Sequence, residues 1–338
     1  MASKQSSITS EQISVVVQGP VIGSDGQLAT QQLTKQSLLS VRNHLPRAEL
    51  ILSTWEGSDV SELSFDTLVL NTDPGAMPYE MDRPAVNNVN RQIECTKNGV
   101  QSSSRQYVLK LRSDSVLLGT GFTTYFGRFP ARSKCSILSK KVIASTRGSF
   151  IPEYRMAQSC YFPSDWFHFG LREDVLNIWD IPLAPEPETT RWLPKAPLPW
   201  YRGGPRLRYA IEQYIWVTFL RKHYCITFDS MWDQTESTIR DSECSIAGNL
   251  ILITPDQAQI KSLKYPETWG FLNHCVNGCY THTLWKALYE KHCLESTVQR
   301  YQLMRLFYKY IYSVNEASRP LRHWCRCHYG LRKFLKKS

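Results

Sequence analysis

The sequence lacks the features that mark several large classes of protein. No apolar run approaches the roughly 20 residues that a membrane-spanning helix needs. Its ten cysteines show no regular disulfide spacing, and the opening segment MASKQSSITSEQ is too polar for a secretory signal. We therefore expect a cytoplasmic protein whose thiols stay reduced.

Motifs for common cofactors are also missing. The sequence has neither a G-x-G-x-x-G motif nor a P-loop. These absences disfavour dinucleotide-dependent oxidoreductases and P-loop NTPases. His274, Cys275, Cys279 and His282 are ligand-type residues at short spacing, but no C-x-x-C knuckle accompanies them. We expect buried thiols and a solvated histidine there rather than zinc.

Acidic residues are absent from the C-terminal segment 319–338, which contains seven lysines and arginines. Much of the net charge of +10 therefore lies in this tail, and the mildly basic remainder argues against a nucleic-acid partner. Apolar residues recur at helical spacing between basic ones, at Leu321, Trp324, His328, Leu331 and Leu335. This pattern predicts an amphipathic helix that holds the protein at the anionic inner face of a membrane.

The N-terminal third alternates strand and helix patterns. Short runs rich in Val, Ile and Leu predict strands at 13–21, 48–55, 65–73 and 106–116. Helical patterns occupy 30–45 and 87–103, and we expect Asn98-Gly99 to close the second helix. Such alternation predicts an α/β fold of the Rossmann type, with a mostly parallel sheet and helices on both faces.

The second half is mixed and then helical. Strand patterns at 141–150 and 165–171 precede helical patterns that include 207–223 and 296–314. The proline-rich stretch 181–205 is either an ordered loop over a site or a surface excursion. We expect a flexible N-terminus at 1–12, one domain at 13–318 with a nucleotide-binding half (13–125) and an acceptor half (126–318), and the basic tail.

Polar residues follow four predicted strands. They are Gln18-Gly19-Pro20, Ser53-Thr54-Trp55-Glu56, Asn71-Thr72-Asp73 and Arg112-Ser113-Asp114. Because ligands bind outside the carboxyl ends of strands in open parallel sheets, these four ends predict a binding site. Asp114 is either a turn residue or a ligand for Mg²⁺ or Mn²⁺ on a diphosphate, and Lys110 and Arg112 add positive charge near it.

Several segments together resemble the WavE lipopolysaccharide-synthesis family of bacterial glycosyltransferases. These are ISVVVQGPV, NTDPGA, NVNRQI followed by TKNG, VLKLRSDSVL and SDWFHFG, and the resemblance covers roughly Ile13 to Leu220. It implies a fold of the GT-A type, a nucleotide-sugar donor and an acceptor in the core oligosaccharide of lipopolysaccharide. GT-A enzymes usually carry Asp-x-Asp at the strand end. Here only the second acid, Asp114, is present, which leaves metal dependence open.

The resemblance also suggests roles for individual residues. Around the donor we expect Gln18, Gly19, Pro20, Thr54, Asp73, Arg91, Lys110, Arg112, Ser113 and Asp114, with ordinary turn and helix-surface positions as the alternative. If the transfer inverts configuration, a base must deprotonate the acceptor hydroxyl. Glu212, on an apolar helix, and Asp165 are the two candidates. Trp166 and His168 are candidates for the acceptor wall, although a histidine among aromatic residues is more often part of the core.

The sequence thus predicts a glycosyltransferase that uses a nucleotide sugar. Two alternatives stay open: a nucleotidyltransferase that makes a nucleotide sugar, and a non-catalytic component of a polysaccharide assembly complex that binds glycan or nucleotide. The segment QGPVIGSDG, which follows the first strand, is poor in the basic residues that nucleotidyltransferases usually have there.

Overall fold

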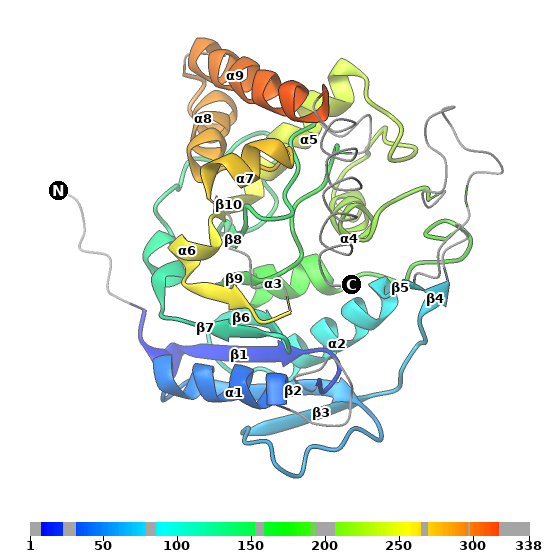
Figure 1. Ribbon diagram of the computed structural model, residues 1–338, viewed down its shortest axis with the longest axis vertical. Coiled ribbons are helices and arrows are strands. Elements are labelled where there is room, and N and C mark those ends of the chain that lie inside the picture. Colours follow the sequence, from blue (N-terminus) through cyan, green and yellow to red (C-terminus); the bar gives the residue numbers. More distant parts are fainter. Residues whose placement is uncertain are drawn as a thin grey trace, which may run out of the picture.

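The computed structural model describes residues 8–22, 32–78, 86–152, 159–190, 192, 207–264, 270–296 and 298–317. A central sheet of seven strands organises this part of the chain (Figure 1). Its strands are β1 (Ile13–Gln18), β2 (Glu49–Trp55), β3 (Thr67–Asn71), β6 (Tyr107–Arg112), β8 (Val142–Ser145), β9 (His168–Leu171) and β10 (Leu250–Ile253). Two small sheets pair β4 (Met77–Pro78) with β5 (Val86–Asn87), and β7 (Ser115–Leu117) with β11 (Ile260–Ser262).

The central sheet is mostly parallel, as the sequence predicts. Its order is β10-β8-β9-β6-β1-β2-β3, and β1 pairs in parallel with both β6 and β2. Only β9 runs antiparallel, between β6 and β8. The prediction of a mostly parallel α/β sheet is confirmed, and the four polar strand ends at Gln18, Trp55, Asn71 and Arg112 lie along one edge.

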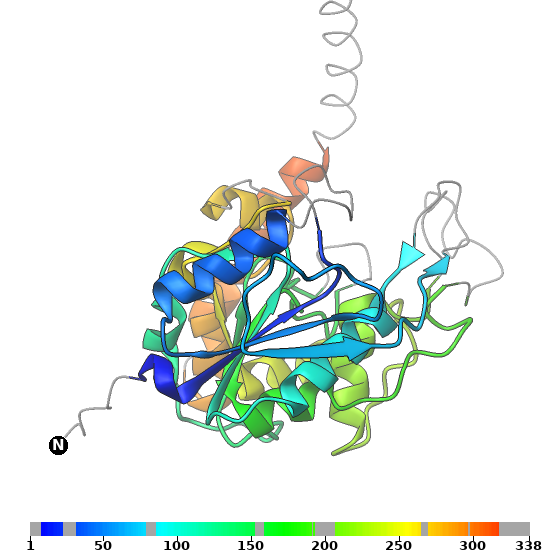
Figure 2. The ribbon, with the colours of Figure 1, turned by 90° about the horizontal axis from the view of Figure 1, so that it is seen from below.

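Helices cover both faces of the sheet (Figure 2). Near β1, α1 (Gln32–His44) lies on one face and α2 (Val89–Gln101) on the other. The remaining α-helices are α3 (Arg172–Trp179), α4 (Ile211–Arg221), α5 (Glu236–Asn249), α6 (Pro255–Ala258), α7 (Phe271–Val276), α8 (His282–Cys293) and α9 (Val298–Ala317). Two 3-10 helices, η1 (Ser10–Gln12) and η2 (Gly121–Tyr125), complete the described elements.

Asn98-Gly99 does not close the second helix, so that prediction was wrong. Gly99 lies inside α2, where a Cβ atom would come 2.4 Å from Val16 Cγ1 and 3.0 Å from Ser53 Cβ. The glycine serves close packing of the helix on β1 and β2 instead of ending the helix. The helix that brings Arg91 to the sheet edge is thereby held directly against the strands.

The two halves expected on either side of residue 125 share one sheet, because β8, β9 and β10 come from the second half.

A buried carboxylate ties the C-terminal helices together. Glu243 on α5 accepts hydrogen bonds from Lys291 Nζ of α8, at 2.8 Å, and from the Tyr301 hydroxyl of α9. Burial alone would raise the pKa of Glu243, but His292, Lys291 and Arg305 outweigh it and lower that pKa to about 2.

Two sequence predictions fall outside the described residues. The basic tail, 319–338, is one, and most of the proline-rich stretch, at 191 and 193–206, is the other. Within the described part of the chain, no helix has the length and apolar character needed to cross a membrane.

Replacing Gly99 with alanine tests the close packing of α2. Because the added methyl group would overlap Val16, we expect Gly99→Ala to lower the free energy of unfolding by about 1–3 kcal/mol. Urea denaturation measures the change. Gly270→Ala is the control, since a Cβ there meets no atom within 4 Å. Equal stability of the two variants would contradict this account of Gly99.

Candidate functional site

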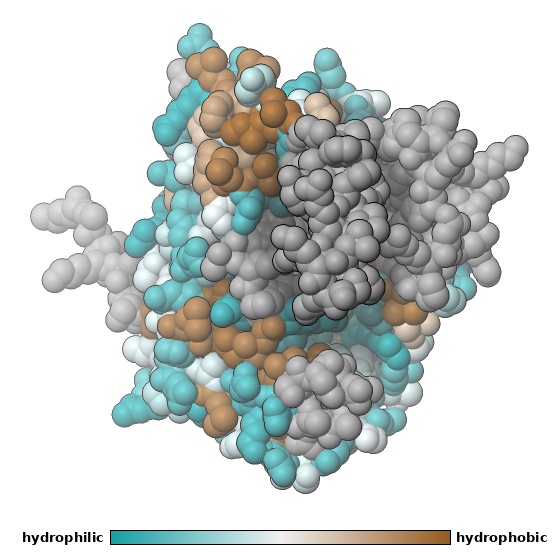
Figure 3. All heavy atoms as spheres, viewed as in Figure 1, coloured by the Kyte–Doolittle hydropathy of each residue, from teal (hydrophilic) through white to brown (hydrophobic). Residues whose placement is uncertain are grey.

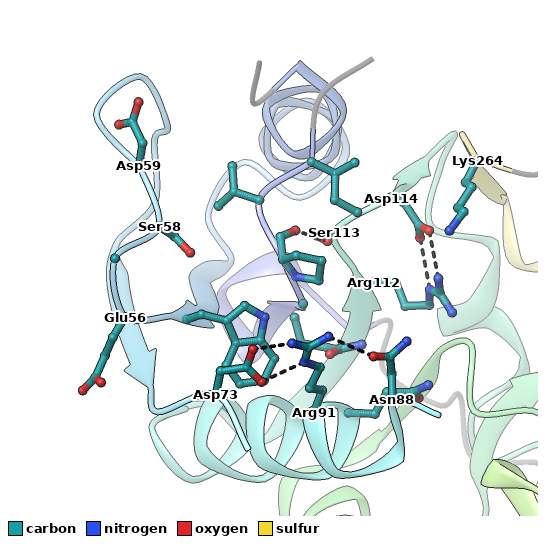
Figure 4. A pocket seen from close by; sticks show the side chains of 18 residues that line it. Glu56, Ser58, Asp59, Asp73, Asn88, Arg91, Arg112, Ser113, Asp114 and Lys264 are labelled. Carbon is teal, nitrogen blue, oxygen red and sulfur yellow. Dashed lines mark hydrogen bonds and ion pairs between the residues drawn. The ribbon is translucent and has the colours of Figure 1, made fainter. Parts of the chain in front are cut away.

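A cavity of about 730 Å³ lies at the carboxyl ends of β1, β2, β3 and β6 (Figure 4). It is lined by Gln18-Gly19-Pro20 after β1, by residues 55–59 after β2, by Asp73 after β3 and by Arg112-Ser113-Asp114 after β6. Asn88, Arg91 and Gln92, from the start of α2, complete this wall. The sheet thus brings together most of the residues that the sequence assigns to donor binding.

The floor of the cavity is the junction between β1 and β6. Gln18 is in register with Arg112, and the Ser113 amide donates to the Gln18 carbonyl at 2.9 Å. The Ser113 hydroxyl donates to the Pro20 carbonyl at 2.7 Å. Gly19 has a φ of +120°, and a Cβ there would lie 3.1 Å from the Ser113 hydroxyl. Only glycine adopts this backbone conformation without strain.

Asp114 is held by the arginine two residues before it. Arg112 Nε donates to Asp114 Oδ1 at 3.1 Å and Arg112 Nη2 to Oδ2 at 2.9 Å, which makes a bidentate pair. The Ser115 hydroxyl adds a third bond to Oδ1, at 3.3 Å. Asp114 is buried, whereas a third of the Arg112 side chain is exposed. The carboxylate therefore orients the guanidinium at the cavity wall.

A second arginine–carboxylate pair lies between β3 and α2. Arg91 donates through Nε to Asp73 Oδ1 at 2.7 Å and through Nη2 to Oδ2, and its Nη1 donates to Asn88 Oδ1 at 3.1 Å. The Gly75 amide also donates to Asp73 Oδ1. Hydrogen bonding to Arg91 lowers the pKa of Asp73, and the same contact raises the pKa of Arg91. Both groups therefore stay charged over the physiological range.

These contacts decide how well the site fits a divalent cation. Mg²⁺ and Mn²⁺ take several oxygen ligands, and protein carboxylates supply them together with phosphate. Both oxygens of Asp114 already accept from Arg112, and Glu56 and Asp59 lie on the opposite side of the cavity (Figure 4). Among the described residues, no three His, Cys, Asp or Glu side chains are placed to hold a metal ion. The donor set does not fit a divalent cation at Asp114, and Arg112 occupies the position beside the carboxylate.

Trp55, Gln92 and Lys264 are among the lining residues that the sequence did not assign to donor binding. Trp55 ends β2, and Gln92 follows Arg91 on α2. The Gln92 side-chain carbonyl is buried and has no hydrogen-bond partner in the described structure. Lys264 arrives from the second half of the chain, because β11 pairs with β7 and the Leu263 amide donates to the Asp114 carbonyl at 2.8 Å. No local pattern in the sequence signals that placement.

Charge is separated across the cavity. Arg112 and Lys264 lie on one side, beside Asp114 (Figure 4). Glu56 and Asp59 lie on the opposite side. Such a cavity offers cationic donors at one end and hydrogen-bond acceptors at the other. This polarity matches a ligand that has an anionic group at one end and hydroxyl or amine donors at the other.

Lys110, which the sequence assigned to donor binding, does not line this cavity. Its side chain is fully buried, its Nζ donates to the Asp165 carbonyl, and it lies 4.7 Å from the centroid of the Trp179 ring. Burial lowers the pKa of Lys110 to about 8, even though the negative charges of Asp165, Asp114 and Glu212 act to raise it. Lys110 shares a face of β6 with Arg112, but it lies two residues farther from the strand end and is therefore enclosed by the protein.

Glu212 and Asp165 therefore lie near the buried Lys110 ammonium, because both carboxylates raise its pKa. Glu212 is in the first turn of α4 and is partly exposed, while Asp165 is buried. Neither residue lines the cavity of the strand ends. Thr54 does not line it either, since its side chain is buried and contacts the Ser58 hydroxyl at 3.3 Å.

The acceptor wall expected at Trp166 and His168 is not found. His168 is buried, accepts a hydrogen bond from Trp179 Nε1 at 2.9 Å, and has a pKa lowered to about 3, mainly by burial. Trp166 is buried and donates to the Ser115 hydroxyl at 2.9 Å. Both residues pack in the core, which is the alternative that the sequence already offered for His168.

Of the four ligand-type residues in and between α7 and α8, three are buried and His282 is half-buried. Cys275 and Cys279 are buried as expected, but His274 is buried too, with Nε2 2.8 Å from the Thr146 hydroxyl and Nδ1 3.0 Å from the Gly270 carbonyl. His282 Nδ1 lies 2.7 Å from the Leu252 carbonyl. These ring nitrogens make structural hydrogen bonds.

The buried amine of Lys110 predicts a pH dependence of stability. Between pH 8 and 10.5 the unfolded chain holds a proton at this lysine that the folded chain has lost, so stability rises with pH in this window. We expect Lys110→Met to remove a rise of roughly 2–3 kcal/mol. Urea denaturation of both proteins at pH 8 and 10.5 measures it, and the other titrating groups cancel in the comparison. Parallel pH profiles would show that Lys110 is solvated in the folded protein.

Comparisons with known proteins place the chain in a family. A search among curated proteins finds no similar sequence. Among solved structures, the chain is similar to the inositol-1-phosphate CTP transferase from T. maritima, with 10% identity, a TM-score of 0.30, and coverage of 70% of this chain and 97% of that one. No conclusion about this chain rests on that likeness. The profile of the family described as WavE lipopolysaccharide synthesis matches residues 13–319, and the chain therefore belongs to the WavE family.

Proposed function

We propose that this protein is a glycosyltransferase that moves a sugar from a nucleotide-sugar donor to a lipopolysaccharide core or a related surface-glycan acceptor. The observation that carries the proposal is the cavity at the carboxyl ends of β1, β2, β3 and β6, with a cationic and an acidic side. In open parallel sheets nucleotides bind at this edge. Family membership supports the link to lipopolysaccharide.

The nucleoside fits the acidic side of the cavity. Trp55 offers an aromatic face against which a base stacks. The Gln92 carbonyl, which has no partner in the described structure, accepts a hydrogen bond from a base amine or a ribose hydroxyl. Asp73 holds Arg91 in place and so acts as a positioning residue.

The diphosphate fits the opposite side, between Arg112 and Lys264. Two of the five N–H groups of Arg112 bind Asp114, which fixes the guanidinium plane against the cavity wall. Arg112 and Lys264 then neutralise the charge that develops on the nucleoside diphosphate as the bond to the sugar breaks. In this proposal Asp114 orients Arg112, and the two cations take the role that a divalent metal has in a site with two acids.

The base that accepts the acceptor proton is Glu212 in this proposal. Its place in the first turn of α4 leaves it partly exposed, whereas Asp165 is buried. In an inverting transfer the carboxylate takes the hydroxyl proton, the acceptor oxygen bonds to the anomeric carbon, and the nucleoside diphosphate leaves with the bonding electron pair.

Donor binding is tested by thermal unfolding with UDP-, GDP-, ADP- and CMP-linked sugars, each with and without EDTA. We expect at least one donor to raise the melting temperature, and the shift to persist in EDTA. Arg112→Gln and Lys264→Gln each remove a charged hydrogen bond to phosphate, so we expect affinity to fall about tenfold to a hundredfold.

Arg105→Gln is the matched control, because Arg105 is exposed immediately before the amino end of β6. It should bind donor as the wild type does. A shift that appears only with Mg²⁺ or Mn²⁺ would overturn the role of the two cations. No shift with any of the four donor classes would count against the glycosyltransferase itself.

Glu212→Gln tests the catalytic base. Since general-base catalysis contributes roughly 10²–10⁴-fold, we expect the transfer rate to fall by several hundredfold while the donor still shifts the melting temperature. Asp165→Asn is the comparison for the second candidate. Normal turnover in the Glu212 variant together with an inactive Asp165 variant would move the role to Asp165.

A further inference from the structure

The last described helix, α9, has two apolar faces. Tyr301 and Tyr308 point into the core, where Tyr301 binds Glu243 and the Tyr308 hydroxyl lies against that of Thr281. The opposite face carries large apolar side chains that are between 51% and 70% exposed: Leu303, Leu306, Phe307, Tyr310 and Val314. Their spacing of three and four residues forms one stripe along the helix.

The neighbouring helix α7 adds exposed apolar side chains beside α9. Phe271 and Leu272 of α7 are at least half exposed, and the Phe271 ring lies 5.6 Å from the Tyr308 ring of α9. Figure 3 shows apolar residues gathered over α7 and α9 at the top of the view. Half of the exposed large apolar side chains of the described residues belong to this α7–α9 face. A surface of this kind marks an interaction site, because isolated exposed leucines are normal but a gathered set is not.

Charge around the α7–α9 face identifies the partner. Lys309 and Arg300 are exposed on α9 and flank the apolar stripe on its two sides, although Arg300 also pairs with Glu290 at 3.6 Å. The sequence that follows α9, residues 319–338, has seven lysines and arginines and no acidic residue. An apolar stripe bordered by positive charge is the pattern of helices that lie in the interface of an anionic bilayer.

We propose that the α7–α9 face docks on an anionic membrane surface, with α9 parallel to the bilayer plane. Leu303, Leu306 and Phe307 enter the boundary between head groups and acyl chains, and Tyr310 lies at the level of the head groups. The buried face of α9 stays on the protein, anchored through Glu243. This proposal concerns α7 and α9 and does not depend on the reaction at the cavity.

The test is co-sedimentation of the full-length protein with vesicles of phosphatidylcholine alone or mixed with phosphatidylglycerol. We expect binding to the mixed vesicles that weakens as salt is raised, since salt screens the charge contribution. The double variant Leu303→Ser/Leu306→Ser should lower the partition coefficient by about tenfold or more. Binding that is absent, or equal in wild type and variant, would overturn the proposal.

Leu118→Ser is the matched control, because Leu118 is also more than half exposed but lies after β7, away from α9. It should bind vesicles as the wild type does. Thermal unfolding checks that all variants keep the wild-type fold, which is expected because the substituted side chains are exposed. Size-exclusion chromatography with light scattering tests whether a second copy of the chain binds this face instead. A dimer that the double variant abolishes would assign the face to self-association and overturn the membrane proposal.

Discussion

The parallel pairing of β1 with β6 is the constraint on which the site depends. It sets Gln18 beside Arg112, and the bonds from Ser113 to Gln18 and Pro20 lock the two strand ends together. The strands β2 and β3 add in parallel on the other side of β1. The carboxyl ends of all four strands therefore lie on one edge of the sheet. A slip of one residue between β1 and β6 would turn Arg112 away from the cavity and bring Leu111 there.

Carboxylates in this protein mainly orient cations. Asp114 fixes Arg112 and Asp73 fixes Arg91, each through two parallel hydrogen bonds, so both guanidinium planes have one defined orientation at the cavity wall. Glu243 has a similar role away from the cavity. Its buried carboxylate forms ion pairs with Lys291 and Arg305 and accepts a hydrogen bond from the Tyr301 hydroxyl. Asp114 and Glu243 are buried, so removing either would take a charged partner from cations inside the protein, which is more costly than losing a surface ion pair.

The anchoring of α9 links the core to the proposed membrane surface. A helix with apolar residues on both sides would normally bury all of them, but the Glu243 cluster binds only the face that carries Tyr301 and Arg305. The stripe with Leu306 and Tyr310 is consequently presented outward in a fixed orientation. The cavity and the α7–α9 face are separate features, so donor binding and membrane docking can be measured independently.

The sequence by itself determined the parallel sheet and its functional edge, because runs of Val, Ile and Leu ending in polar residues encode both burial and strand ends locally. Gln18, Asp73, Arg91 and Asp114 were accessible to that reasoning, since each lies at or near such an end. Only the tertiary structure decided the direction of Lys110, which depends on which face of β6 meets Trp179, and the buried places of Trp166 and His168. Gly99 appeared to end a helix and instead allows close packing against Val16. Lys264 reaches the cavity because β11 pairs with β7 and the Leu263 amide binds the Asp114 carbonyl, a long-range pairing that no local pattern records.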